Sequence, residues 1–345
     1  MAAIATVGPA MPPLSTTLRC AAAIVALLAV SAHAQLFKDP ALQALYDAER
    51  VADLDAVARK RLADKSDDAQ AVLGLAMASL QGSEGPRREA AITRAQACIK
   101  AQPQAAECHY ALGTVLGVHA MSQGLMKMAG SVGTVKEALL QALALAPQWW
   151  PARSAVVEFY LVAPGMLGGS TSKASEVARA ASRSAQVKAL EARIALAAER
   201  FAQALATLQG LQPGTDSALA EDLAAWTASA GFALLGKGQA AQARPVFERL
   251  LRDQPQHAVG AYGLGRLLLE QGASAEAIKW LEQAARSRGA AQFPIDYRLG
   301  LALQAEGRAE PARAALGRFV ASGRGSSKAL DDARKRLAPL GGAPA

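Results

Sequence analysis

The fold is decided by residues 258–291, which read AVGAYGLGRLLLEQGASAEAIKWLEQAARSRGAA. Apolar residues recur at helical spacing on both sides of Gly272. A glycine at that place ends a helix cheaply, because it tolerates the left-handed conformation. The stretch therefore predicts two short helices joined by a tight turn. A hairpin this thin cannot bury its apolar face alone, so it requires neighbours of the same kind.

The same pattern returns on both sides of this stretch, after shifts of 34 and 35 positions. Downstream it consists of Tyr297, Leu299, Gly300, Leu303, Gly307, Ala312, Leu316 and Phe319, and upstream of Gly231, Leu234, Gly238, Ala243, Phe247 and Pro255. This periodicity resembles the tetratricopeptide repeat, a helix-turn-helix unit of about 34 residues. The resemblance implies an all-α chain that forms an α-α superhelix of about six to seven units.

Each recurring residue type has a physical role in such a hairpin. Glycine at the eighth position, as at Gly265, lets the two antiparallel helices approach closely, and alanine at the twentieth, as at Ala277, does so from the other side. Proline at the thirty-second position, as at Pro255, lies beyond the second helix, which it cannot continue. We expect these rules to hold most strictly in the clearest repeats, 224–255, 258–291 and 293–322.

Upstream of residue 224 the units are less regular. Tyr110, Leu112 and Gly113 open one unit whose second helix comes late, so about ten extra residues, within 117–134, are expected between its helices. A degenerate pair or cap is expected over Asp39–Ala63, and a capping helix over Lys328–Leu337. The solenoid is thus expected over residues 35–338, followed by a flexible tail over 339–345.

The first 34 residues have the pattern of a signal peptide. Arg19 precedes the apolar run Ala21–Val30, and Ala32-His33-Ala34 offers small residues for cleavage. No later apolar stretch is long enough to span a bilayer. The mature chain is therefore expected in the periplasm or secreted, after cleavage near Ala34. The formal charge is +8, but basic and acidic residues are interspersed, so no nucleic-acid partner is expected.

No motif for catalysis, nucleotide binding or a resident metal or cofactor is found, and the chain is not expected to be an enzyme. Two cysteines, Cys98 and Cys108, are expected on antiparallel neighbouring helices. They favour a disulfide in an oxidising compartment, with two separate buried thiols as the alternative.

Two segments leave alternatives open. His119, Met121, Met126 and Met128 lie in or near the extra segment and offer ligands for Cu(I), although packing of an apolar insert is favoured and no metal site is assigned. The loop Ala163–Ser170, within 163–172, could hold an anion at the next helix N-terminus. An elongated turn in which Ser170 or Ser172 caps that helix is preferred.

The resemblance also implies that the first helix of each repeat lines a concave groove. The groove candidates are Tyr110, Tyr262, Tyr297, Arg266, Glu270, Trp149 and Trp150. Trp149 and Trp150 point about 100° apart on a helix, so both are not expected to be buried. The expected function is a periplasmic scaffold or adaptor that binds a protein or peptide partner. The alternatives are an assembly factor of an envelope complex and a copper-handling protein.

Overall fold

The computed structural model describes residues 36–80, 85–212 and 217–341, and the expected signal peptide lies outside these ranges. Within them the chain forms seventeen α-helices and no β-strand. The helices are α2 Pro40–Asp47, α3 Val51–Asp64, α4 Ala69–Leu80, α5 Gly85–Ala101, α6 Ala106–Ser122, α7 Leu125–Leu145, α8 Trp150–Val162, α9 Thr171–Arg179, α10 Ser184–Ala197, α11 Phe201–Gln209, α12 Ser217–Gly236, α13 Ala240–Asp253, α14 Ala258–Glu270, α15 Ser274–Ala285, α16 Ile295–Ala305, α17 Ala309–Ser322 and α18 Ser327–Leu337. Short 3₁₀ turns follow α8, α15 and α18 at Gly165–Leu167, Ala290–Gln292 and Ala338–Leu340.

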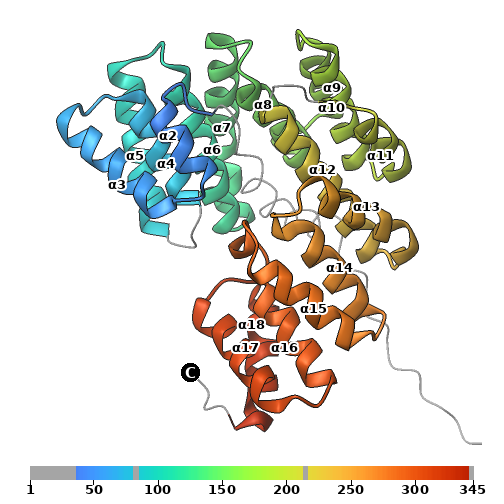
Figure 1. The fold of residues 1–345 in the computed structure, drawn as a ribbon. Coiled ribbons are helices and arrows are strands. Elements are labelled where there is room, and N and C mark those ends of the chain that lie inside the picture. Colours follow the sequence, from blue (N-terminus) through green and yellow to red (C-terminus); the bar gives the residue numbers. More distant parts are fainter. Residues whose placement is uncertain (1–35, 81–84, 213–216, 342–345) are drawn as a thin grey trace, which may run out of the picture.

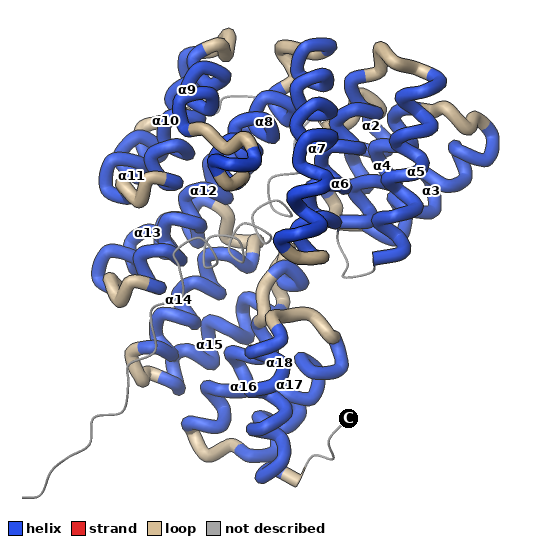
Figure 2. Tube along the Cα trace, turned by 180° about the vertical axis from the view of Figure 1, so that it is seen from behind, coloured by secondary structure: helices blue, strands red, loops and turns tan. Residues whose placement is uncertain are grey.

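The helices form a curved stack of antiparallel pairs, with α18 at its end (Figure 1). The described residues hold eight such pairs, from α2–α3 to α16–α17, where about six to seven were expected. Extensive contacts between helices two places apart all join even-numbered helices, such as α4 with α6 and α12 with α14. Helices on the inside of a curve crowd together, so the even-numbered helices line the concave side. Figure 2 shows the same all-helical stack from behind.

The repeat rules that the sequence predicted hold in the three clearest pairs. A methyl group added to Gly265 of α14 would lie 2.7 Å from Cγ of Leu281 on α15. Ala277 approaches from the other helix and is fully buried. The turns after α12, α14 and α16 each carry a glycine with positive φ, including Gly272 at 80°. Small residues therefore set the distance between the two helices of each pair.

The prediction that about ten extra residues separate the two helices of the third unit was wrong about where those residues lie. The extra residues do not form a long loop, because α6 and α7 run to Ser122 and from Leu125 and leave only two residues between them. The segment holds no proline, and its Ala, Leu, Met and Lys residues favour a helix. The added length therefore lies within the two helices, of which α6 has 17 residues and α7 has 21.

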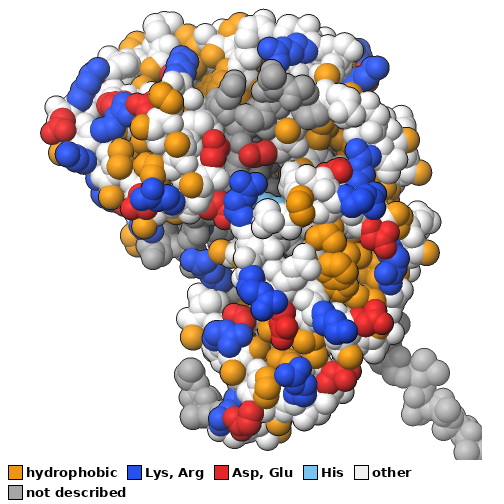
Figure 3. Space-filling model, in the orientation of Figure 1, with side chains coloured by type: hydrophobic (Ala, Val, Ile, Leu, Met, Phe, Trp, Pro, Cys, Tyr) orange, Lys and Arg blue, Asp and Glu red, His pale blue; other side chains and the backbone are white. Residues whose placement is uncertain are grey.

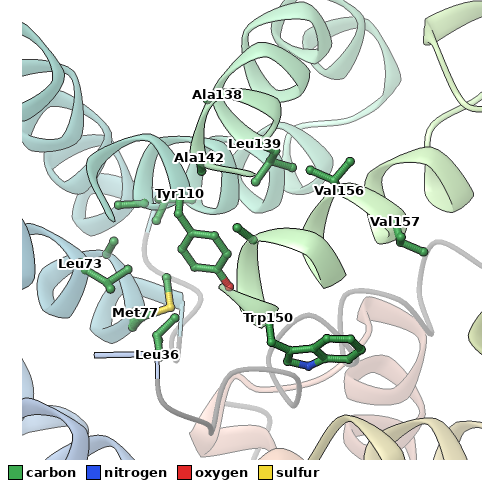
Figure 4. Packing of buried hydrophobic residues seen from close by; sticks show 14 of the residues in the cluster. Leu36, Leu73, Met77, Tyr110, Ala138, Leu139, Ala142, Trp150, Val156 and Val157 are labelled. Carbon is green, nitrogen blue, oxygen red and sulfur yellow. The ribbon is translucent and has the colours of Figure 1, made fainter. Parts of the chain in front are cut away.

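A continuous apolar core runs from Leu36 through α12, and a second core runs from α12 through α17. Figure 4 shows part of the first core, in which Tyr110 of α6 points toward Trp150 at the start of α8. Tyr46 of α2 belongs to the same core and is 4% exposed. The short first helix is thus an integral part of the inner packing.

The last helix covers the end of the stack, as the sequence predicted for Lys328–Leu337. Ala333 of α18 packs against Leu316 and Phe319 of α17. Among the described residues, no helix is both long and apolar enough to cross a membrane.

Candidate functional site

The inner side of the C-terminal repeats carries a group of aromatic and charged side chains, which we call the α14 face: Phe232, Tyr262, Arg266, Glu270 and Phe293. Phe232 lies on α12, Phe293 precedes α16, and the other three lie on α14. Tyr262, Arg266 and Glu270 are spaced by four residues, so one helical face presents all three. In the view of Figure 3, hydrophobic side chains gather over the region of α14.

The rings of the α14 face form a ladder across three repeats. The Tyr262 ring stacks on Phe293 with centroids 4.8 Å apart and lies 5.7 Å from Phe232. The Arg266 guanidinium carbon lies 5.9 Å from the centroid of the Phe232 ring. This distance is within the range of a cation–π contact. The side chains are therefore ordered by one another before any partner arrives.

Charge on this face is balanced and partly accessible. Nε of Arg266 lies 2.8 Å from Oε1 of Glu270, and these side chains are 23% and 34% exposed. Burial raises the pKa of Tyr262, so its hydroxyl remains protonated at neutral pH. The Tyr262 ring itself is 4% exposed, so the accessible apolar area of this face comes from the half-buried Phe232 and Phe293, beside a partly exposed ion pair. Such a combination suits a peptide more than a small charged metabolite.

Phe232 and Phe293 were not among the residues that the sequence singled out. Phe232 precedes Arg266 by one repeat of 34 residues, so both occupy the ninth position of their repeats. The repeat alignment could have identified Phe232. Phe293 precedes its helix, and its stacking on Tyr262 depends on the loop after α15, which no periodicity describes.

The other predicted groove residues lie elsewhere. Tyr297 is half-buried beneath α18, where its hydroxyl donates to Oδ2 of Asp332 at 2.9 Å. Tyr110 is 6% exposed and packs on the half-buried Trp149 with ring centroids 4.8 Å apart. The seven candidates thus fall into separate groups along the stack, and only Tyr262, Arg266 and Glu270 share one face.

Trp150 takes part in a buried polar contact across the concave side. Its indole Nε1 donates to Oδ2 of Asp222 at 2.7 Å, and the Ser154 hydroxyl donates to the same oxygen at 3.1 Å. Asp222 is 2% exposed. Burial raises the pKa of its carboxyl group to about 8, a change that the two hydrogen bonds oppose. These hydrogen bonds join α8 directly to α12.

One helical turn further along α8 lies a buried ion pair. Glu158 accepts two hydrogen bonds from Arg193 of α10, to Oε1 at 2.5 Å and to Oε2 at 2.6 Å. The two side chains are 9% and 7% exposed. A bidentate pair satisfies both partners and fixes their relative orientation. Sequence periodicity had no means of pairing residues from different repeats.

The two cysteines of the described chain are joined. Cys98 at the end of α5 and Cys108 at the start of α6 form a disulfide with Cα atoms 5.8 Å apart. The loop Ala163–Ser170 ends in the helix cap that the sequence predicted. Ser170 Oγ accepts a hydrogen bond from the backbone N–H of Lys173 in the first turn of α9. His119 Nε2 lies 2.6 Å from the amide nitrogen of Gln123. No group of three or more His, Cys, Asp or Glu side chains that could hold a metal ion occurs among the described residues, and the side chains of Met126 and Met128 lie outside them.

Comparison with known families gives a match to the tetratricopeptide repeat over residues 230–291. This segment contains α13, α14 and α15 with the end of α12. Four of the five residues of the α14 face therefore lie within the matched segment. No curated protein matches the sequence.

Solved structures with a similar arrangement include a tetratricopeptide repeat protein from Parabacteroides merdae ATCC 43184, with 13% identity, a TM-score of 0.43 and coverage of 73% of this chain and 93% of that one. Pseudomonas aeruginosa pilF shares 20% identity at a TM-score of 0.40, over 67% of this chain and 97% of that one. A chain of the APC/C hetero-tetramer Cut9-Hcn1 shares 14% identity at a TM-score of 0.43, over 87% of this chain. The present chain spans 55% of the length of the last of these.

Proposed function

The chain carries tetratricopeptide repeats, and on that basis we propose that it is a scaffold or adaptor that binds a segment of a partner protein along its concave side. The observation that carries the proposal is the α14 face. There, Tyr262 stacks on Phe293 beside the accessible ion pair of Arg266 and Glu270. Aromatic and arginine side chains dominate the binding energy of many protein interfaces.

The order of this face favours recognition of an extended segment. Its rings come from α12, from α14 and from Phe293 just before α16, so they form a row along the stack rather than a single pocket. The rings contact one another already, which lowers the ordering cost of binding. A chain laid across the even-numbered helices would meet the α14 face over several of its own residues.

We place this function outside the cytoplasm, in the periplasm. The support is the signal-like segment ending near Ala34, with the disulfide between Cys98 and Cys108. Disulfides persist in oxidising compartments and are rare where glutathione keeps thiols reduced. Fractionation of cells that express the tagged chain, with thiol labelling before and after reduction, tests this placement. Recovery of a chain that retains residues 1–34 from the cytoplasm would contradict it.

The binding role is tested by photo-crosslinking in intact cells. A photoreactive amino acid at Arg266 samples the α14 face, and the same amino acid at Lys279, exposed on α15, samples the outer side. We expect discrete crosslinked species from position 266 that position 279 does not give. The partner is then identified from the crosslinked band.

A charge-reversal variant tests the chemistry of the same surface. Arg266→Glu places a second carboxylate beside Glu270 and removes the cation from the Phe232 ring. The photoreactive amino acid is then placed at another position of the α14 face. We expect Arg266→Glu to abolish its crosslinks and Lys279→Glu to leave them unchanged. Equal crosslinking by both variants would mean that the α14 face is not the binding surface.

A further inference from the structure

A cavity of about 380 Å³ lies between the last repeats of the stack. Its lining comes from the end of α15, the 3₁₀ turn Ala290–Gln292, the start of α16, the end of α17 and the loop that follows α17. In Figure 1 these elements belong to the orange and red part of the molecule. Sites that hold small molecules have volumes of about 300–1,000 Å³. The cavity is therefore large enough for an organic ligand.

Most of the cavity wall is apolar. Its larger apolar residues are Phe293, Pro294, Ile295 and Phe319, with alanine side chains beside them. Phe319 and Ile295 are buried, and Phe293 is half-buried. An apolar molecule that enters the cavity exchanges contact with water for contact with these side chains, which is favourable.

Two aromatic contacts hold the rings of this wall in place. Phe293 stacks on Tyr262 with ring centroids 4.8 Å apart. Phe319 packs on Tyr297 with ring centroids 5.1 Å apart. The Tyr297 ring is fixed in turn, because its hydroxyl donates to Asp332 of α18. The rings are thus ordered before a ligand arrives, which lowers the cost of binding.

One cation on the cavity lining has no partner. Arg324 belongs to the loop after α17 and is exposed, and no described residue pairs with its guanidinium group. The Ser322 hydroxyl fixes the loop, because it accepts from the backbone N–H of Arg324 at 3.1 Å and donates to the carbonyl oxygen of Phe319 at 2.7 Å. A methyl group added to Gly325 would lie 2.7 Å from the Phe319 ring. The loop therefore lies against the apolar wall and keeps Arg324 at the cavity.

An acidic residue of the lining does not neutralise this cation. Asp296 also lines the cavity, but its Oδ1 accepts from Nε of Arg318 at 3.1 Å and from the second guanidinium nitrogen at 2.6 Å. The charges of Asp296 and Arg318 cancel, so Arg324 leaves the site with one positive charge to balance. A guanidinium group binds a carboxylate through two parallel hydrogen bonds. The charge of the site therefore matches a ligand with a single carboxylate.

We propose that this cavity binds a small apolar monocarboxylate. The apolar body of the ligand packs against Phe293, Ile295 and Phe319, and its carboxylate pairs with Arg324. A wholly apolar ligand would leave the guanidinium group unused. A ligand with several negative charges would bring unpaired anions against apolar walls, which is costly.

This small-molecule site does not depend on the partner binding proposed for the concave side. The cavity lining and the α14 face have one residue in common, Phe293, which stacks on Tyr262. The two proposals can therefore fail separately. Loss of crosslinking at Arg266 tests the α14 face, whereas binding of a small carboxylate tests the cavity.

Calorimetric titration of the purified chain tests the proposal with a matched set of probes. Naphthylacetate carries a ring and a carboxylate, naphthylacetamide carries the same ring with a neutral amide, and acetate lacks the ring. We expect naphthylacetate to bind saturably, with a dissociation constant of about one millimolar or lower. Naphthylacetamide and acetate should each bind at least about tenfold more weakly.

Variants locate the bound probe. Arg324→Ala should weaken the binding of naphthylacetate about tenfold or more and leave that of naphthylacetamide unchanged. Ala291 is an exposed residue of the lining, so Ala291→Trp should fill the cavity and abolish the binding of both. Arg313→Ala removes an arginine of α17 that pairs with Glu310 outside the cavity lining, and it should bind as the wild type does. Circular dichroism and thermal unfolding establish that each variant is folded.

Two results would overturn the proposal. One is a wild-type chain that shows no saturable binding of naphthylacetate at millimolar concentrations. The other is an Arg324→Ala variant that binds naphthylacetate as tightly as the wild type.

Discussion

Glu49 accepts, through Oε2, a hydrogen bond of 3.1 Å from the backbone N–H of Gly289, which lies 240 positions further along the chain. Glu49 follows α2, and Gly289 follows α15, so the contact joins the first helical pair to the C-terminal half of the stack. In Figure 1 the first helices, in blue, approach the orange segment at the centre of the molecule. The superhelix is therefore curved enough to touch itself.

The contact between Glu49 and Gly289 predicts a local effect on the hydrogen exchange of the Gly289 amide. Glu49→Ala removes the acceptor, and the amide of Gly289 should exchange its hydrogen about ten- to a hundredfold faster, because a hydrogen bond to a charged group contributes about 1.5–3 kcal/mol. Glu49 has a φ of 55°, and alanine keeps the same Cβ, so backbone strain changes little. Hydrogen exchange measured by NMR or mass spectrometry reads the result. Asp47→Ala, which removes a carboxylate bonded to Gln43, is the control.

The buried carboxyl of Asp222 predicts a pH-dependent stability. Burial is the main cause that raises the pKa of this carboxyl group from its ordinary value of 3.8 to about 8 in the folded chain. The folded state thus holds a proton that the unfolded state has lost between these values. The contribution of the Asp222 carboxyl group to the free energy of unfolding is fully present below about pH 4. It decreases as pH rises toward 8, by at most about 1.4 kcal/mol per pH unit.

Asp222→Asn tests this directly, since an amide does not titrate and still accepts from Trp150 and Ser154. The difference in unfolding free energy between the two proteins, from urea titrations at several pH values, should change in favour of the variant as pH rises toward 8. A difference that is independent of pH would show that the carboxyl is not protonated in the fold.

The Glu158–Arg193 pair predicts a strong non-additivity. Arg193→Met leaves an unpaired carboxylate in a site that is 9% exposed, and loss of one partner of a buried pair costs about 3–5 kcal/mol. Glu158→Leu together with Arg193→Met removes both charges and should recover most of that loss. Chemical unfolding of the two single variants and the double variant completes the cycle. Additive losses would mean that the pair is not coupled.

Glycine at the eighth repeat position predicts a position-specific cost. Gly265→Ala brings a methyl group within 2.7 Å of the Leu281 side chain and 3.2 Å of its backbone nitrogen, so we expect about 1–3 kcal/mol of destabilisation. Gly317 lies inside α17 with nothing within 4 Å of an added methyl group. Gly317→Ala should therefore stabilise the fold, by about 0.5–1 kcal/mol. Thermal unfolding of both variants gives the comparison, and equal effects would remove the close-approach explanation.

The repeating part of the fold was predictable from residues 258–291 and their shifted copies. Gly272, Gly265 and Ala277 have the predicted roles because each acts inside a single hairpin, where sequence spacing and spatial distance are linked. The capping helix was predicted because a stack of hairpins needs a polar cover at its end. For the candidate site, spacing along α14 placed Tyr262, Arg266 and Glu270 on one face.

The sequence by itself determined that this chain is a stack of helical hairpins, because hairpin formation depends on neighbours within one period. Only the tertiary structure decided how tightly the stack curves, and therefore that Glu49 meets Gly289 and that Trp150 bonds Asp222. Those contacts depend on small rotations between successive pairs, which add up along the chain and leave no local signal.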